Sequence, residues 1–171
     1  MYRWLAGIFR GVGASIHDWI PKSARIAANG QGLDDGSRSR PASEQDAVIT
    51  ADALRDAGRY AEAAEAYAAA LFLMPVRNDL RVQRANMLKD AGRLKEATIV
   101  YRVAECIEPA GLARADIRLQ CARALLNLQD HGEAAAFYQA VIAEAPEQEL
   151  GIVAQAELNR LRLLHLSPYW L

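Results

Sequence analysis

One pattern occurs three times in this sequence, and each copy ends at a proline. The copies are GRYAEAAEAYAAALFLMP at 58–75, GRLKEATIVYRVAECIEP at 92–109 and QDHGEAAAFYQAVIAEAP at 129–146. Pro75 and Pro109 are 34 residues apart, and Pro146 follows 37 residues later. Self-similarity at a period of this length is typical of repeat proteins, in which each unit buries its apolar face by stacking on its neighbours.

The residues shared by the three copies favour closely packed helices. A glutamate–alanine pair recurs at 62–63, 96–97 and 133–134, and a tyrosine follows four residues after each alanine, at Tyr67, Tyr101 and Tyr138. The chain has 34 alanines among its 171 residues, and alanine is the best helix former. Small residues let two helices cross closely, whereas proline cannot continue a helix. We therefore expect an all-α fold built from short helices.

These residues resemble the tetratricopeptide repeat, a 34-residue helix–turn–helix unit. In the register of that family, position 8 holds Ala51, Ala85 and Ala122, position 20 holds Ala63, Ala97 and Ala134, and position 32 is proline in every copy. The resemblance implies a right-handed α-solenoid. Its repeats would cover 44–77, 78–111 and 112–148, and the last would contain a three-residue insertion, Leu112-Ala113-Arg114.

The turns inside the repeats differ in one respect. Gly58 and Gly92 stand where the first helix of a repeat ends, and glycine readily takes the left-handed conformation found at such ends. The third copy has Gln129 at this place, so we expect a less regular third turn. Ser43 is the predicted N-cap of the first repeat, with Asp46 at the capping-box position.

A capping segment, 149–171, follows the third repeat. Residues 149–166 have the pattern of an amphipathic helix, and Gln155, Asn159, Arg160 and Arg162 supply the polar outer face that the end of a solenoid needs. Pro168 would stop this helix. We expect the apolar residues Tyr169-Trp170-Leu171 either to dock on the helix or to mark the place where a longer chain was cut.

The segment before the repeats divides into an N-terminal region, 1–28, and a linker, 29–43, which lacks apolar periodicity. Residues 1–20 are expected to form an amphipathic helix with an apolar arc of about 160°. The members of this arc include Trp4, Leu5, Ile8, Phe9, Val12, Ile16 and Trp19. Residues 1–33 carry a net charge of +3, and the remainder therefore carries −4. Two interpretations stay open: docking on protein, within the chain or in a dimer, and peripheral contact with an anionic membrane.

The resemblance also implies a binding groove, because the first helices of such repeats line a concave surface. The positions concerned hold Gln45, Val48, Ile49, Asp52, Arg55 and Asp56 in the first repeat, Asp79, Val82, Gln83, Asn86, Lys89 and Asp90 in the second, and Asp116, Leu119, Gln120, Arg123, Leu126 and Asn127 in the third. Glu157 and Arg160 extend the row. We expect Gln83, Asn86, Lys89, Gln120 and Arg123 to bind a peptide or helix. Chaperone-binding members of the family clamp a C-terminal carboxylate with Lys and Asn where this chain has Val48 and Asp52, which disfavours that ligand.

The sequence shows no signature of catalysis, a metal or a cofactor. It has no zincin helix, phosphate-binding glycine loop or nucleophile elbow, and Cys106 and Cys121 lack the second pair of a zinc site. The near-neutral balance of 20 basic against 21 acidic residues argues against nucleic acid as a partner. No apolar run is long enough to span a membrane, and no secretory signal is evident. We therefore predict a non-catalytic adaptor in the cytoplasm, with a peripheral membrane tether through residues 1–20 as the alternative.

Overall fold

The computed structural model describes residues 43–166, and within this range it contains helices and no strand. Residues 1–42 and 167–171 lie outside the described part of the chain. The predicted amphipathic helix at 1–20, with its apolar face from Trp4 to Trp19, falls outside it. So do the linker up to residue 42 and the apolar tail that ends at Leu171.

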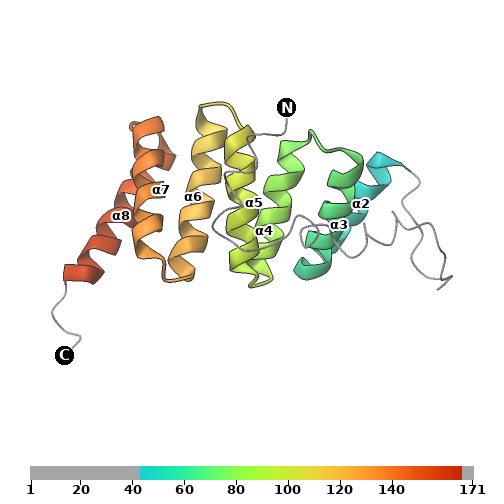
Figure 1. Cartoon of the computed structure of the whole chain (residues 1–171), viewed down its shortest axis with the longest axis horizontal. Coiled ribbons are helices and arrows are strands. Elements are labelled where there is room, and N and C mark those ends of the chain that lie inside the picture. The colour runs from blue at the N-terminus through green and yellow to red at the C-terminus, as the bar shows by residue number, and fades with distance from the viewer. Residues whose placement is uncertain (1–42, 167–171) are drawn as a thin grey trace, which may run out of the picture. The chain divides into compact units, whose positions relative to one another are not determined.

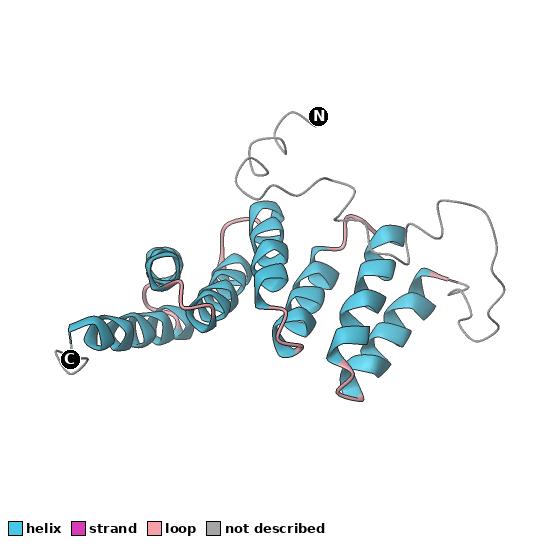
Figure 2. Ribbon diagram, turned by 60° about the horizontal axis from the view of Figure 1, so that its bottom comes forward, coloured by secondary structure: helices cyan, strands magenta, loops and turns pink. Residues whose placement is uncertain are grey.

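Seven helices follow one another along a single array (Figure 1). They are α2 (Glu44–Asp56), α3 (Tyr60–Leu73), α4 (Asn78–Asp90), α5 (Leu94–Ile107), α6 (Leu112–Asn127), α7 (His131–Glu144) and α8 (Glu149–Leu166). Each helix packs on the one before it and the one after it, and the loops alternate between the two ends of the helices (Figure 2). The predicted solenoid of three helix pairs with a capping helix is confirmed.

The three turns within the repeats share one geometry, so the expectation of a less regular third turn is wrong. Gly58 and Gly92 have φ values of 70° and 75°, and Gln129 takes the same left-handed conformation with φ 62°. In all three turns the N–H of this residue and that of the next donate back into the last turn of the first helix, at 2.8–3.0 Å. This pair of bonds is the Schellman arrangement. Its hydrogen bonds, supported by packing on both sides, hold Gln129 in a conformation that L side chains disfavour.

Helix starts and stops follow the predicted signals. The Ser43 hydroxyl accepts a hydrogen bond from the Asp46 N–H at 3.1 Å, which confirms the predicted N-cap of α2. Asp130 caps α7 in the same way by accepting from the N–H of Glu133, also at 3.1 Å. The second helices α3, α5 and α7 end two residues before Pro75, Pro109 and Pro146.

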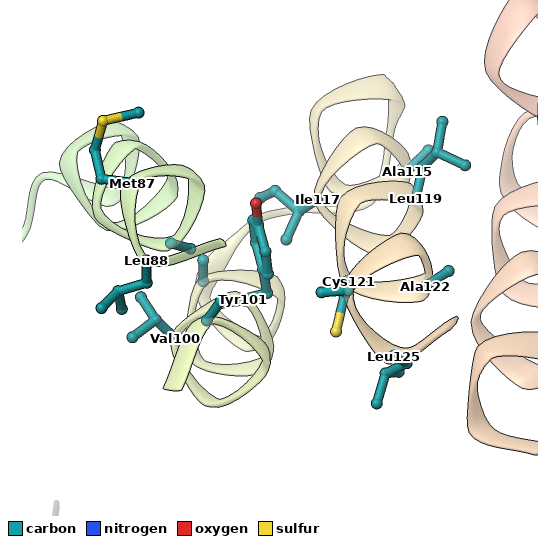
Figure 3. Packing of buried hydrophobic residues seen from close by; sticks show 14 of the residues in the cluster. Met87, Leu88, Val100, Tyr101, Ala115, Ile117, Leu119, Cys121, Ala122 and Leu125 are labelled. Atoms are coloured by element: carbon teal, nitrogen blue, oxygen red, sulfur yellow. The ribbon is translucent and has the colours of Figure 1, made fainter. Parts of the chain in front are cut away.

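The core consists of small residues at the helix crossings and one tyrosine in each repeat. The alanines at positions 8 and 20 of every repeat are fully buried, as are Tyr67, Tyr101 and Tyr138. Figure 3 shows Tyr101 of α5 between Leu88 and Val100 on one side and Ile117 of α6 on the other. Close crossings leave narrow gaps between helix pairs, and the aromatic ring fills such a gap while its hydroxyl reaches polar surroundings.

The insertion Leu112-Ala113-Arg114 extends α6 by one turn at its start, so α6 has 16 residues where α2 and α4 have 13. Gly111, with φ 141°, makes the bend that precedes it. The Gly111 N–H and the Arg114 guanidinium both donate to Glu144 at the end of α7, at 2.6 and 3.0 Å. The extra turn is thereby fixed to the second helix of its own repeat.

The capping helix α8 packs closely against the end of α7. A Cβ atom added at Gly151 would lie 1.9 Å from the carbonyl oxygen of Ala145, so only glycine fits at this contact. Asn159, Arg160 and Arg162 of α8 are exposed, as predicted for its outer face, whereas Gln155 is partly buried.

Candidate peptide-binding surface

The first helices of the repeats form one row. Helix α4 contacts α6, and α6 contacts α8, while the second helices in the described range show no comparable contact with one another. Helices that approach each other across repeats lie on the inner side of a curved stack, because that side is the shorter one. We call the face of α2, α4, α6 and α8 that carries the predicted groove residues the inner surface.

Lys89 and Gln120 are brought together on this surface. The Lys89 ammonium of α4 donates to Gln120 Oε1 of α6 at 3.1 Å. The Gln120 amide in turn points at Asp116 Oδ1, one helical turn earlier, at 3.5 Å. These three side chains therefore form a polar link between the second and third repeats.

Asn86 joins the inner surface to the core. Its Oδ1 accepts a hydrogen bond of 2.6 Å from the hydroxyl of the buried Tyr101. The Asn86 amide nitrogen has no acceptor among the described residues, so it is the part of this side chain that remains to donate to a ligand. Gln83, one turn earlier on α4, is partly buried and makes no side-chain hydrogen bond within the described range.

Arg123, the fifth predicted residue, is already paired. Its guanidinium contacts the Glu157 carboxylate of α8, with Nη2 to Oε1 at 2.5 Å. Desolvation raises the pKa of Glu157, but the hydrogen bonds and charge of Arg123 outweigh it and leave the pKa below its ordinary value. Arg123 therefore acts first as a clamp between α6 and the capping helix, and its charge is compensated before any ligand binds.

The first repeat contributes a different set of groups. Asp52 accepts from the Tyr67 hydroxyl at 2.5 Å and pairs with Arg55 at 2.8 Å. Desolvation, followed by the bond to Asp52, raises the pKa of Tyr67 to about 12. Ile49 is the most exposed apolar side chain of the inner surface, at 57%. Leu119, which the resemblance placed in the groove, is 2% exposed and belongs to the core.

The charge balance of the inner surface is acidic. Across the predicted groove positions of α2, α4 and α6, together with Glu157 and Arg160, there are six acidic and four basic side chains. Two of the four basic groups, Arg55 and Arg123, are held in ion pairs with Asp52 and Glu157. The surface therefore offers amide donors and carboxylates more readily than uncompensated positive charge.

Three contacts of this surface were missed from the sequence. The Arg123–Glu157 pair has a readable signal, because its partners have opposite charges and are one 34-residue period apart. In a stack of repeats, equivalent positions of neighbouring units lie side by side. The hydrogen bonds from the Tyr67 hydroxyl to Asp52 and from the Tyr101 hydroxyl to Asn86 each join residues 15 positions apart. A single copy of the repeat gives no sign of such a bond, and it emerges only when the copies are compared.

Three observations on the described residues concern metal sites, membrane spans and cysteines. No group of three or more His, Cys, Asp and Glu side chains in this range could hold a metal ion. No helix found between residues 43 and 166 is long and apolar enough to cross a bilayer. Cys121 is buried, which raises the pKa of its thiol to about 12, while Cys106 is exposed.

Stacked helix pairs of 34 residues with the first helices in one row define an α-solenoid of helix–turn–helix repeats. The same arrangement is found in the Arabidopsis OM64 TPR domain, with a TM-score of 0.58, 18% identity, and coverage of 68% of this chain and 94% of that one. It is found in the first TPR domain of Spaghetti (RPAP3) bound to the HSP90 peptide SRMEEVD, with a TM-score of 0.62, 18% identity, and coverage of 77% and 100%. The described part of this chain therefore has the tetratricopeptide-repeat fold.

A third similar structure is the Yersinia enterocolitica type III secretion chaperone SycD in complex with a peptide of the translocator YopD. Its TM-score is 0.60 and its identity 18%, and the match covers 71% of this chain and 93% of that one. No protein-family model matches the chain, and no curated protein matches it.

Proposed function

We propose that this protein is a non-catalytic interaction module that binds a protein segment on its inner surface. The observation that carries the proposal is the line of amide and ammonium donors on α4 and α6, formed by Gln83, Asn86, Lys89 and Gln120. These side chains are all partly exposed, and they lie where neighbouring first helices approach each other. Two solved structures with this fold hold peptides, which supports the same use here.

The inner surface favours a neutral or basic segment over an acidic one. The HSP90 peptide bound to the RPAP3 domain carries three acidic residues in the sequence SRMEEVD. In this chain, Asp52 and Glu157 lie on the inner surface, and Arg123 is neutralised by Glu157. An acidic peptide would have to compete for that arginine, whereas an uncharged or basic segment would meet carboxylates and the exposed Ile49.

The test compares wild type with a double variant that removes donors from the inner surface, Gln83→Ala/Lys89→Ala. The matched control, Lys95→Ala/Gln148→Ala, removes the same two residue types from exposed positions on α5 and in the loop before α8. Affinity capture followed by direct binding of the recovered partner is the measurement. We expect the control to bind like wild type and the inner-surface variant to lose affinity by about tenfold, which corresponds to about 1.4 kcal/mol. Equal binding by all three proteins would contradict the assignment.

A photo-crosslinking residue at position 49 provides an independent readout. Ile49 is exposed and makes no contribution to the buried core, so its replacement should leave the fold intact. We expect crosslinks to the partner from position 49 and none from position 95 on the second-helix side. Crosslinks from position 95 alone would place the binding surface on the opposite side of the array.

A further inference from the structure

An apolar cleft lies at the C-terminal end of the array, between α7 and α8. It has a volume of about 530 Å³. Ala135 and Gln139 of α7 and Leu158 and Leu161 of α8 form its walls, with His131 and Arg162 among its lining residues. The cleft is separate from the inner-surface donors of α4 and α6. What occupies it is therefore independent of the peptide-binding function proposed above.

The cleft is open because α8 does not turn where the other first helices turn. Helices α2, α4 and α6 end at Asp56, Asp90 and Asn127, and a left-handed residue follows two positions later. The equivalent position in the capping segment is Leu163, which is helical, 68% exposed and followed by helix up to Leu166. Within the described residues, no second helix therefore packs beside α7 and α8 as it does in the preceding repeats.

We propose that the apolar tail, residues 167–171, folds back and places Trp170 in this cleft. The tail has five residues, which span up to about 17 Å when extended. The cleft residue Arg162 lies four residues before the end of α8, a distance of about 6 Å along a helix. Pro168 cannot continue the helix and so diverts the chain soon after Leu166. The length of the tail is therefore sufficient to reach the cleft.

Chemistry also favours the tail as the occupant. Its residues Tyr169, Trp170 and Leu171 are large and apolar, and the tail has no charged side chain. Arg162 at the cleft disfavours an occupant with basic side chains, such as residues 1–20. The polar tips of tyrosine and tryptophan need partners when they are buried, and the cleft is lined by the polar side chains of Gln139, His131 and Arg162.

The test uses the full chain with Trp4→Phe and Trp19→Phe, which leaves Trp170 as the single tryptophan. We expect blue-shifted emission from Trp170 and several-fold weaker quenching by acrylamide than for an exposed tryptophan. Ala135→Glu, which fills the cleft, should restore full quenching. Ala136→Glu on the same helix is the matched control, because Ala136 is exposed and lies outside the cleft. Full quenching of Trp170 in the parent, or equal quenching in the parent and Ala135→Glu, would overturn the proposal.

A second variant covers the case in which Ala135→Glu disturbs folding. Trp170→Ala alters only the tail, and we expect it to lower the unfolding midpoint of the full chain, whereas Ser167→Ala should leave it unchanged. Equal midpoints for Trp170→Ala and wild type would overturn the proposal. The quenching is also measured over a range of protein concentrations. Protection that disappears on dilution would assign the cleft to a second copy of the chain and overturn docking within one chain.

Discussion

The hydroxyl of Tyr101 donates to Asn86 Oδ1 at 2.6 Å, and this bond ties a groove side chain to the centre of the core. The equivalent residues of the first repeat, Tyr67 and Asp52, are joined in the same way at 2.5 Å. In the third repeat the corresponding position is Arg123, which pairs with Glu157 of the capping helix. The side chain at this inner-surface position in repeats one and two is thus the acceptor for a buried hydroxyl.

This relationship predicts unequal effects for the two halves of the Tyr101–Asn86 bond. Tyr101→Phe removes the donor together with its need for a partner, and we expect a loss of about 1 kcal/mol in the free energy of unfolding. Asn86→Ala leaves the buried hydroxyl without its acceptor, and we expect a loss of about 2 kcal/mol. Urea unfolding of both variants and of the double variant measures the difference. An Asn86→Ala protein as stable as wild type would contradict this account.

The turn at Gln129 predicts a stabilising substitution. Gln129 is exposed and has φ 62°, a conformation that costs an ordinary L residue about 1–2 kcal/mol. Glycine adopts it without that cost but loses more chain entropy on folding. We therefore expect Gln129→Gly to raise the free energy of unfolding by about 0.5–1 kcal/mol.

Thermal and urea unfolding of Gln129→Gly against wild type provide the measurement. Glu147→Gly, at an exposed position in the loop before α8, is a control for the general effect of adding glycine. If Gln129→Gly destabilised the protein as much as this control, the left-handed strain at residue 129 would not be significant.

We expect substitution by alanine to change the stability in opposite directions at two helical glycines, Gly151 and Gly132. At Gly151 an added Cβ would lie 1.9 Å from the Ala145 carbonyl oxygen, so α8 must shift away from α7. At Gly132 in α7 the added atom would meet nothing within 4 Å. We expect Gly151→Ala to destabilise by about 2 kcal/mol or more through overpacking, and Gly132→Ala to stabilise by up to about 1 kcal/mol through helix propensity. Calorimetric midpoints of the two variants would test this contrast, and a shift in the same direction for both would contradict it.

Much of the fold was predictable because the repeat encodes it locally. Alanine at positions 8 and 20, tyrosine at position 24 and proline at position 32 each act at their own place in the unit, and all are found in the roles expected of them. Gln129 could not be assigned in this way. Its backbone is set by the helices on both sides of the turn, which override the preference of the residue itself.

The candidate surface was less predictable than the fold. Its positions follow from the repeat register, but the chemistry of each side chain depends on its neighbour in the next unit. Arg123 reads as a ligand-binding cation in the sequence and is paired with Glu157 in the structure. Likewise, an asparagine side chain carries both a donor and an acceptor. In the structure only the amide nitrogen of Asn86 remains, because its oxygen accepts from Tyr101.

The surroundings of the Glu144 carboxylate allow us to predict how the stability of the protein depends on pH. Its side chain is 9% exposed and contacts Arg114 and Arg118 at 2.9 and 2.6 Å. Its Oε1 also accepts from the Gly111 N–H at 2.6 Å. Desolvation raises the pKa of Glu144, but the hydrogen bonds from Arg114 and Gly111 and the charge of Arg118 outweigh it, so the folded pKa lies below the ordinary value.

The unfolded chain has a glutamate pKa of about 4.3. Because the folded pKa is lower, the stabilisation by Glu144 is complete above about pH 5 and is lost as the pH falls through the folded pKa. We expect Glu144→Gln to lower the free energy of unfolding by about 1–2 kcal/mol at pH 7, with a difference from wild type that shrinks below pH 4. Urea unfolding at a series of pH values measures it. Glu147→Gln, in the loop after α7, is the control and should follow wild type throughout, whereas a Glu144→Gln deficit that stayed constant down to pH 3 would exclude the ionised carboxylate as its source.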